Sequence, residues 1–185
     1  MVGTIDQFRA NLIGGGARAN QFKVEITNPP GIAVGLPVEN AAFLCKGSNL
    51  PSMAVGEIPL PFRGRTVYIA GDREFADAWT TTFLNDTNFA IRNAMERWQN
   101  GINDLVTGTG SVVSSDYQAD LRVSQLDRDD QVLKVYLFRN AWPLTVSQID
   151  LATDATNAIE EFEVTWRYQH FEASEVTPGL AALAG

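Results

Sequence analysis

The chain has 185 residues, with 14 lysines and arginines against 22 aspartates and glutamates, giving a formal net charge of −8. This length predicts a single domain over residues 1–185, and an apolar content of 45% is too high for a disordered chain. An acidic chain is poorly suited to gripping nucleic acid through its phosphates, because that needs a cationic surface. The single cysteine and single histidine exclude an internal disulfide and metal sites built from several such residues.

The charge is unevenly distributed along the chain. Residues 1–70 contain six basic and four acidic residues, whereas residues 71–185 contain eight basic and eighteen acidic ones. Such asymmetry lets one end of a subunit attract the other end of a neighbour, although a solvated acidic surface is the plainer interpretation. Residues 1–10 lack the apolar core of a signal peptide, and no apolar run approaches the roughly 20 residues that span a membrane. We therefore expect a cytoplasmic chain, or one assembled in the cytoplasm.

The first third of the chain predicts an arm followed by short strands. Residues 1–20 are Gly-rich and weakly patterned, which indicates a flexible N-terminal arm, either frayed or ordered against a partner. Phe22–Ile26 alternates apolar and polar residues, as a half-buried strand does. Residues 42–46 form a second short apolar run, which predicts another strand. Within residues 54–70, the prolines at 59 and 61 exclude a helix and a central strand, so a hairpin or long arm is expected.

One segment has helical periodicity. Apolar residues fall at positions 91, 94, 95, 98, 102 and 105, a stripe across four turns. Asp86 or Thr87 can cap its start. Its methionine and tryptophan are better explained by packing against a sheet than by a cofactor site. The sequence therefore predicts one long helix, and only one.

The other segments predict strands. Residues 78–84 alternate, with Trp79 and Phe83 on one face; Ala119–Leu126 and residues 132–138 form a hairpin around the acidic turn 127–130. Residues 132–138 are apolar on both faces, so they predict a central strand that Trp142-Pro143 ends. Residues 147–151 predict a short strand, residues 161–168 the clearest half-buried one, and residues 174–185 an Ala/Gly-rich tail. The fold class expected is mostly β: an antiparallel barrel or sandwich with one α-helix packed on it.

No set of residues converges on chemistry. Residues 127–138 lack the glycine and final glutamate of a calcium loop, and Gly108-Thr109-Gly110 lacks the third glycine of a dinucleotide loop. His170 has no marked nucleophile near it, and Cys45 lies in an apolar run. We expect no enzyme activity, catalytic residue, metal or cofactor. Open strand edges must be covered or used, which favours self-assembly through paired strands and stacked rings.

Several segments, in order, resemble the tail tube protein of contractile-tailed bacteriophages. The most specific are residues 67–75 (VYIAGDREF), 79–83 (WTTTF) and Asn85-Asp86. Supporting segments are Phe22–Ile26, residues 43–46 with Leu50-Pro51, residues 58–65 (IPLPFRGR), 92–98, Trp142-Pro143 and 162–166. The resemblance runs from about residue 18 through nearly the whole remaining chain.

This resemblance implies hexameric rings whose inner strands join into a continuous β-barrel and which stack into a hollow tube. The tube lies inside a contractile sheath, on a baseplate and under a tail terminator, around a tape-measure protein, and it conducts DNA into the host. The implied location is the virion tail, assembled in the host bacterial cytoplasm. A polar, acidic channel suits that task, since it repels phosphates rather than trapping them.

The resemblance also suggests three surfaces. The inter-ring loop comprises Pro59, Leu60, Pro61, Phe62, Arg63 and Arg65, whose arginines would meet acidic residues of the next ring. Arg92 and Glu96 on the polar face of the helix are candidates for touching the sheath. Glu161, Glu163 and Thr165 form a polar strand face that points either to the lumen or outward.

Three alternatives remain open at this point. The chain could build the tube of a phage-derived contractile injection particle, or be the baseplate protein that initiates a tube. From another class, a small-ligand-binding β-barrel would be a monomer with an apolar interior pocket.

Overall fold

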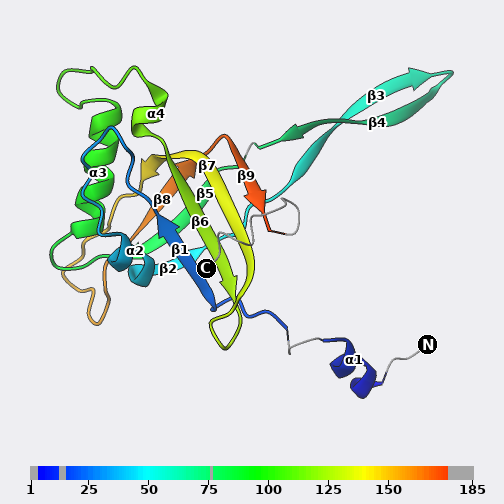
Figure 1. The fold of residues 1–185 in the computed structure, drawn as a ribbon, viewed down its shortest axis with the longest axis horizontal. Helices are drawn as coiled ribbons and strands as arrows, with labels where there is room; N and C mark the ends of the chain where they lie inside the picture. Colours follow the sequence, from blue (N-terminus) through cyan, green and yellow to red (C-terminus); the bar gives the residue numbers. More distant parts are fainter. Residues whose placement is uncertain (1–3, 13–15, 76, 175–185) are drawn as a thin grey trace.

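The computed structural model describes residues 4–12, 16–75 and 77–174, and these contain nine strands and four helices (Figure 1). The strands are β1 (Phe22–Ile26), β2 (Cys45–Ser48), β3 (Ala54–Phe62), β4 (Arg65–Glu74), β5 (Trp79–Leu84), β6 (Ala119–Leu126), β7 (Val132–Val146), β8 (Glu161–Arg167) and β9 (His170–Ala173). The helices are α1 (Ile5–Asn11), α2 (Val38–Leu44), α3 (Ala90–Ile102) and α4 (Ser114–Tyr117). The predicted mostly-β class is confirmed.

All strand pairs are antiparallel, and one long strand connects the two halves of the main sheet. The strand order is β1-β6-β7-β8-β5-β2, with β9 also paired to β7, while β3 and β4 form a separate two-stranded sheet. The first half of β7 pairs with β6 and β9, with Tyr136 opposite Ala173. Its second half pairs with β8, with Trp142 opposite Arg167. Because β7 belongs to both halves, the sheet folds over and encloses a core.

The core lies between the two halves of this sheet. In β8 the residues alternate between buried and less buried, as the sequence predicts for a half-buried strand. Trp79 of β5 stacks on Phe138 of β7, with ring centroids 4.3 Å apart and planes 21° from parallel. The apolar stripe of α3 closes the core, and Trp98 meets Trp166 of β8 edge-on at 5.6 Å. The interpretation of this stripe as a packing face is confirmed.

Each of the three buried indoles has a hydrogen-bond acceptor. The Nε1–H group of Trp98 donates to the carbonyl oxygen of Tyr117 at 2.7 Å. That of Trp166 donates to the hydroxyl oxygen of Thr81 at 2.9 Å, and that of Trp79 to the carbonyl oxygen of Asn49 at 2.8 Å. A buried donor without an acceptor destabilises a fold, so these pairings fix how the large rings are oriented.

The predicted strand break at Trp142-Pro143 is wrong, because β7 continues to Val146. The strand accommodates the proline at an irregularity: Asn140 has a positive φ of 54°, and the register with β8 shifts between Pro143 and Thr145. A proline is tolerated where a ladder is interrupted, since its missing N–H costs nothing there. The short strand predicted at residues 147–151 does not form.

The segment at residues 42–46 is also different from the prediction. Here α2 ends at Leu44 and β2 begins only at Cys45. The buried residues Ala41 and Cys45 are four apart, so one helical turn brings both to the side that packs against the body. The apolar run was too short to distinguish a helix end from a strand.

The long helix, α3, forms as predicted but is shorter at both ends. The N-cap position is Phe89, not the predicted Asp86 or Thr87, but the carboxylate of Asp86 accepts a hydrogen bond from the backbone N–H of Ala90 at 2.9 Å and so pairs one free donor of the first turn. The helix ends at Ile102, and Leu105 is 90% exposed, so this residue does not belong to the apolar stripe. Among the described residues, no helix is both long and apolar enough to cross a membrane.

The N-terminal arm contains a short helix where a flexible, weakly patterned segment was expected. In α1 the Thr4 side chain accepts from the backbone N–H of Gln7, and the Gln7 side chain accepts from that of Thr4. This reciprocal cap has the pattern Thr-x-x-Gln, which is readable in sequence. Parts of the predicted arm, residues 1–3 and 13–15, and the predicted tail beyond Ser174 lie outside the described residues.

Candidate assembly surfaces

The β3–β4 hairpin projects far from the body of the molecule (Figure 1). None of the residues of either strand is buried. At about 3.3 Å per residue, the nine residues of β3 extend about 30 Å. The prediction of a hairpin at residues 54–70 is confirmed, and the hairpin is longer than predicted.

One face of this hairpin is apolar along most of its length. Ile58 lies opposite Ile69 and Leu60 opposite Val67, with Phe62 next on the same face. These five side chains are between 45% and 63% exposed. A two-stranded hairpin is marginally stable alone, and a contiguous exposed apolar surface marks an interaction site. We name these five residues the apolar hairpin face; of them, only Leu60 and Phe62 are among the predicted inter-ring residues.

The opposite face carries the two prolines. Pro59 lies opposite Tyr68 and Pro61 opposite Thr66. Prolines donate no hydrogen bond, so they oppose the addition of a further strand along β3. The hairpin is therefore suited to contact a partner through its side chains rather than by extending its sheet.

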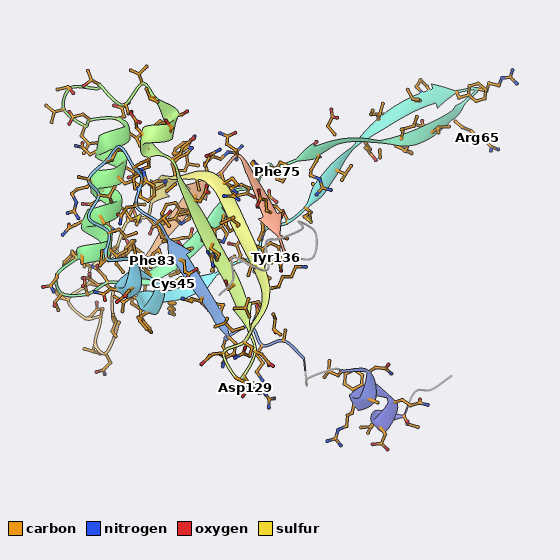
Figure 2. The ribbon with its side chains drawn as sticks, in the orientation of Figure 1. Cys45, Arg65, Phe75, Phe83, Asp129 and Tyr136 are labelled. Atoms are coloured by element: carbon orange, nitrogen blue, oxygen red, sulfur yellow. The ribbon has the colours of Figure 1, made fainter. Side chains whose placement is uncertain are left out.

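The hairpin ends in a tight turn that presents cations and an aromatic ring. Arg63 and Gly64 have φ values of 45° and 79°, as the two central residues of a type I′ turn require. The guanidinium carbon of Arg63 lies 5.3 Å from the centroid of the Phe62 ring. Within the described part of the chain, neither Arg63 nor Arg65 forms an ion pair. Arg65 marks the free end of the hairpin in Figure 2.

At the base of the hairpin, two glycines let the strands approach closely. A side chain at Gly71 would lie 3.1 Å from the carbonyl oxygen of Gly56. The register of the two strands shifts between Val55 and Glu57, a bulge that increases local twist. The specific Ala-Gly-Asp-Arg segment thus lies at the point where the hairpin leaves the body.

Glu161, Glu163 and Thr165 lie together on the face of β8 that points away from the core, since Phe162 and Val164 between them are buried. Thr80 and Thr82 of β5 lie opposite Thr165 and Glu163 and extend this polar surface. Glu161 is ion-paired to Lys46 of β2. We name this surface the β5–β8 polar face; it is rich in hydroxyls and bears two carboxylates and the Lys46 ammonium group.

The other half of the sheet has an outer face crossed by ion pairs. Arg139 of β7 bridges Asp120 of β6 at 2.6 Å and Glu172 of β9 at 3.1 Å. Glu25 of β1 binds Lys23 at 2.7 Å and Arg122 of β6 at 3.3 Å. These pairs balance three cations against three carboxylates, so this face is close to neutral.

The polar face of α3 is partly used within the subunit. The guanidinium of Arg92 donates to Glu96 at 2.9 Å and to the carbonyl oxygen of Ser147 at 3.0 Å, and it lies over the Phe162 ring. Its side chain is only 20% exposed, whereas that of Glu96 is 53% exposed. Of the two residues predicted to touch a sheath, Glu96 is the more accessible.

The residues considered for chemistry do not gather into a site. Burial raises the pKa of Cys45 to about 12, as expected of a packed, unreactive thiol. His170 lies 3.9 Å from Glu172 at a strand end. Residues 127–130 form a hairpin turn, which is closed by a hydrogen bond from the backbone N–H of Asp127 to the backbone carbonyl oxygen of Gln131. Nowhere in the described ranges do three or more His, Cys, Asp or Glu side chains gather as metal ligands.

A family model described as phage tail tube protein matches residues 17–174 of this chain. The chain belongs to the phage tail tube protein family. It is 34% identical over 172 residues to the tail tube protein gp19 of Enterobacteria phage T4, covering 90% of this chain and 98% of that relative. It is 31% identical over 167 residues to the tail tube protein of Serratia phage KSP90, covering 89% and 94%.

The fold of this tail tube protein recurs in a solved extracellular contractile injection system, the PVC sheath/tube terminator in the extended state. The TM-score is 0.60 at 12% identity, over 84% of this chain and 94% of that one. The resemblance inferred from the sequence is thus confirmed. The chain is a structural subunit of a tail tube, and the hairpin, the strand faces and the helix face are its candidate assembly surfaces.

Proposed function

We propose that this tail tube protein forms hexameric rings that stack into the hollow tube of a contractile phage tail. The observation that carries the stacking is the apolar hairpin face, which lies on a hairpin whose strand β3 is about 30 Å long and which projects from a body whose core is already filled. A surface of this kind has no role in a monomer, because it exposes five large apolar side chains to water at a cost in solubility. A second copy in the next ring supplies the missing cover.

Head-to-tail contact accounts for a tube rather than a closed dimer. The hairpin projects from one side of the subunit and is a different surface from those of the body, so a contact between hairpin and body joins unlike surfaces. Contacts between unlike surfaces repeat without limit unless a rotation closes them. When subunits close into a ring, their open strand edges pair with one another and are no longer exposed. Between rings, the hairpin of each subunit contacts the next ring, and this contact repeats along the tube axis.

We assign the β5–β8 polar face to the channel. Glu163 has no ion-pair partner among the described residues. Three threonine hydroxyls and one carboxylate lie near it on the same face, from Thr80 and Thr82 of β5 and Thr165 and Glu161 of β8. A carboxylate- and hydroxyl-lined wall repels phosphates, so DNA passes without being trapped. The face crossed by the Arg139 and Arg122 pairs is less suited, because its three cations balance its three carboxylates and it therefore repels phosphates less.

The remaining partners follow from the tube. A sheath would surround it and touch exposed residues of α3 such as Glu96, baseplate and tail-terminator proteins would hold its ends, and a tape-measure protein would occupy the lumen. The likeness of the fold to a sheath/tube terminator and the phage relatives support this arrangement. Assembly would take place in the cytoplasm of the host bacterium, and the assembled tube would stay in the virion tail.

The ligand-binding alternative has no support in the core. A barrel that holds a small molecule needs an interior pocket, whereas here Trp79, Phe138, Trp98 and Trp166 fill the space between the sheet halves. A genome-free injection particle and a baseplate initiator would use the same stacking surfaces, so they do not alter the proposal for the hairpin.

Electron microscopy of the purified chain tests the proposal. The wild-type protein is expected to form stacked rings or tubes, and the Arg63→Glu/Arg65→Glu variant single rings or short stacks. Both substitutions are at exposed positions, so circular dichroism should show an unchanged fold. Tubes of unchanged length and stability in the variant would contradict a role for the hairpin tip, and a compact wild-type monomer would contradict the proposed function itself.

A further inference from the structure

We infer that the tip of the hairpin docks into a specific groove of a subunit in the next ring, located between α2 and the β6–β7 turn. This inference rests on the proposed stacking of rings and names the surface that receives the hairpin. The groove has a volume of about 820 Å³ and is open to solvent. Its occupant is the Phe62–Arg65 tip of a second copy of this chain.

The groove is apolar where an aromatic ring would enter it. Its apolar wall comprises Phe22 from β1, Ala42 and Phe43 from α2, and Leu126 and Val132 from the ends of β6 and β7. Phe43 is 88% exposed and Val132 38% exposed, although both line the same concave surface. Large exposed apolar residues in a groove indicate a site that a partner covers. Phe62 at the hairpin tip is a large apolar side chain that is 63% exposed, so it suits the apolar wall of the groove.

The charges of the two surfaces are complementary. Glu39 and Asp130 line the groove, are exposed, and form no ion pair within the described part of the chain. The groove also contains Lys23 and Arg122, which share the single carboxylate of Glu25, so its three carboxylates still outnumber its two cations. At the tip Arg63 and Arg65 are the unpaired cations. Two unpaired carboxylates therefore face two unpaired guanidiniums, an arrangement that fixes orientation and rejects reversed contacts.

The positions of the two surfaces suit a head-to-tail stack. Figure 2 labels Arg65 at the free end of the hairpin and Asp129, next to Asp130 in the β6–β7 turn, on the edge of the body. The two labels are widely separated, so the tip does not reach the groove of its own subunit. A contact between such unlike, separated surfaces repeats from one copy to the next.

A competing occupant within the chain is α1. Its residues Ile5 and Phe8 are 77% and 68% exposed and lie on one side of the helix. However, α1 carries one acidic and one basic residue, Asp6 and Arg9, so its charge is not complementary to the two unpaired carboxylates of the groove. The hairpin tip is the better match, and the experiment below separates the two.

The experiment is a charge swap with electron microscopy and sedimentation of assembled tubes as readouts. Arg63→Glu/Arg65→Glu and, separately, Glu39→Lys/Asp130→Lys should each lower the sedimentable fraction at least about tenfold, because like charges then meet in the contact. The four substitutions together should restore tubes. Asp150→Lys/Asp154→Lys, at exposed residues outside the groove and with the same change in net charge as the groove variant, is that variant's matched control and should assemble normally.

Crosslinking gives a second readout that does not depend on charge. In a Cys45→Ala chain, Arg65→Cys with Phe43→Cys should give ladders of covalent dimers and higher species on oxidation of assembled tubes, while Arg65→Cys with Asp154→Cys should not. If the tip variant fails to stack but the groove variant assembles like wild type, the groove is wrong and the proposed stacking survives. The groove assignment is also wrong if two results occur together: the variant with all four substitutions stays disassembled, and Ile5→Ser/Phe8→Ser lowers the sedimentable fraction as Glu39→Lys/Asp130→Lys does. In that case α1 is the occupant of the groove. If the wild-type chain forms no stacked rings, both the proposed function and this inference are contradicted.

Discussion

The hydrogen bond between Trp166 and Thr81 should stabilise the core by an amount that substitution can isolate. Trp166 is fully buried and Thr81 is 1% exposed, and the indole N–H donates to the threonine hydroxyl oxygen at 2.9 Å. Thr81→Val keeps nearly the same volume but leaves this donor without an acceptor. An unpaired buried donor costs about 1–3 kcal/mol. Thr81→Ser keeps the hydroxyl and loses one methyl group, which costs about 0.8 kcal/mol.

A double-mutant cycle with Trp166→Phe measures the bond itself. Phenylalanine has no donor, so in that background Thr81→Val should be nearly neutral or stabilising, although Trp166→Phe alone leaves a cavity. The expected coupling free energy is therefore about 1–3 kcal/mol, well outside the roughly 0.3–0.5 kcal/mol within which independent sites add.

Urea unfolding followed by circular dichroism, at one fixed protein concentration because association shifts apparent stability, provides the assay. A loss of about 2 kcal/mol lowers the midpoint by about 1 M urea for an m value of about 2 kcal/mol/M. A coupling free energy indistinguishable from zero would refute the reasoning, as would a Thr81→Val protein more stable than wild type.

Two other residues have properties that solution measurements can test. Because burial raises the pKa of Cys45 to about 12, iodoacetamide at pH 8 should leave the folded chain unmodified and modify the urea-unfolded chain fully; modification of the folded protein at the rate of a free thiol would show that Cys45 is not packed. The carboxylate of Asp104 accepts hydrogen bonds from the N–H and hydroxyl of Thr107, at 2.7 and 2.9 Å, and from Val106 N–H at 3.0 Å, which lower its pKa below 3.8. A lowered pKa means that the carboxylate stabilises this turn fully above pH 3.8 and loses that effect as the pH falls through the lowered value; the carboxyl carbon NMR titration should show it, and a midpoint at or above 3.8 would contradict the hydrogen bonds.

The strands with strict alternation were predictable from the sequence, and so was the hairpin. In β8 the period-two pattern decides which side faces the core, and Phe162, Val164 and Trp166 are buried accordingly. For the hairpin, Pro59 and Pro61 excluded a helix and a central strand, which left a hairpin or a long arm. These patterns depend only on residues that are close together in the chain, so they can be recognised in a single sequence.

What the sequence did not predict depends on contacts between distant segments. β7 continues through Pro143 because β8 pairs with it on either side of a register shift, a compensation supplied from elsewhere in the chain. Residues 42–44 are helical because α2 packs against β1, a tertiary contact that overrides a short apolar run. The apolar hairpin face became visible only with the register, since Ile58 and Leu60 gain Ile69 and Val67 as neighbours through pairing.

The candidate site was predictable in the same limited sense. The residues of the inter-ring loop were identified by resemblance, but the groove between α2 and the β6–β7 turn combines residues from four elements. Phe22 and Val132 are 110 positions apart, and no local pattern links them. A surface of this kind is a product of the fold and is not encoded in any one segment.

Cryo-electron microscopy of tubes assembled from the wild-type chain is the most direct test of the central claim that the hairpin connects stacked rings. The account predicts six subunits per ring, with β3 and β4 crossing the ring boundary and the apolar hairpin face covered by the adjacent ring. A tube in which the hairpin lies entirely against its own ring, leaving Ile58, Leu60 and Phe62 exposed, would contradict it.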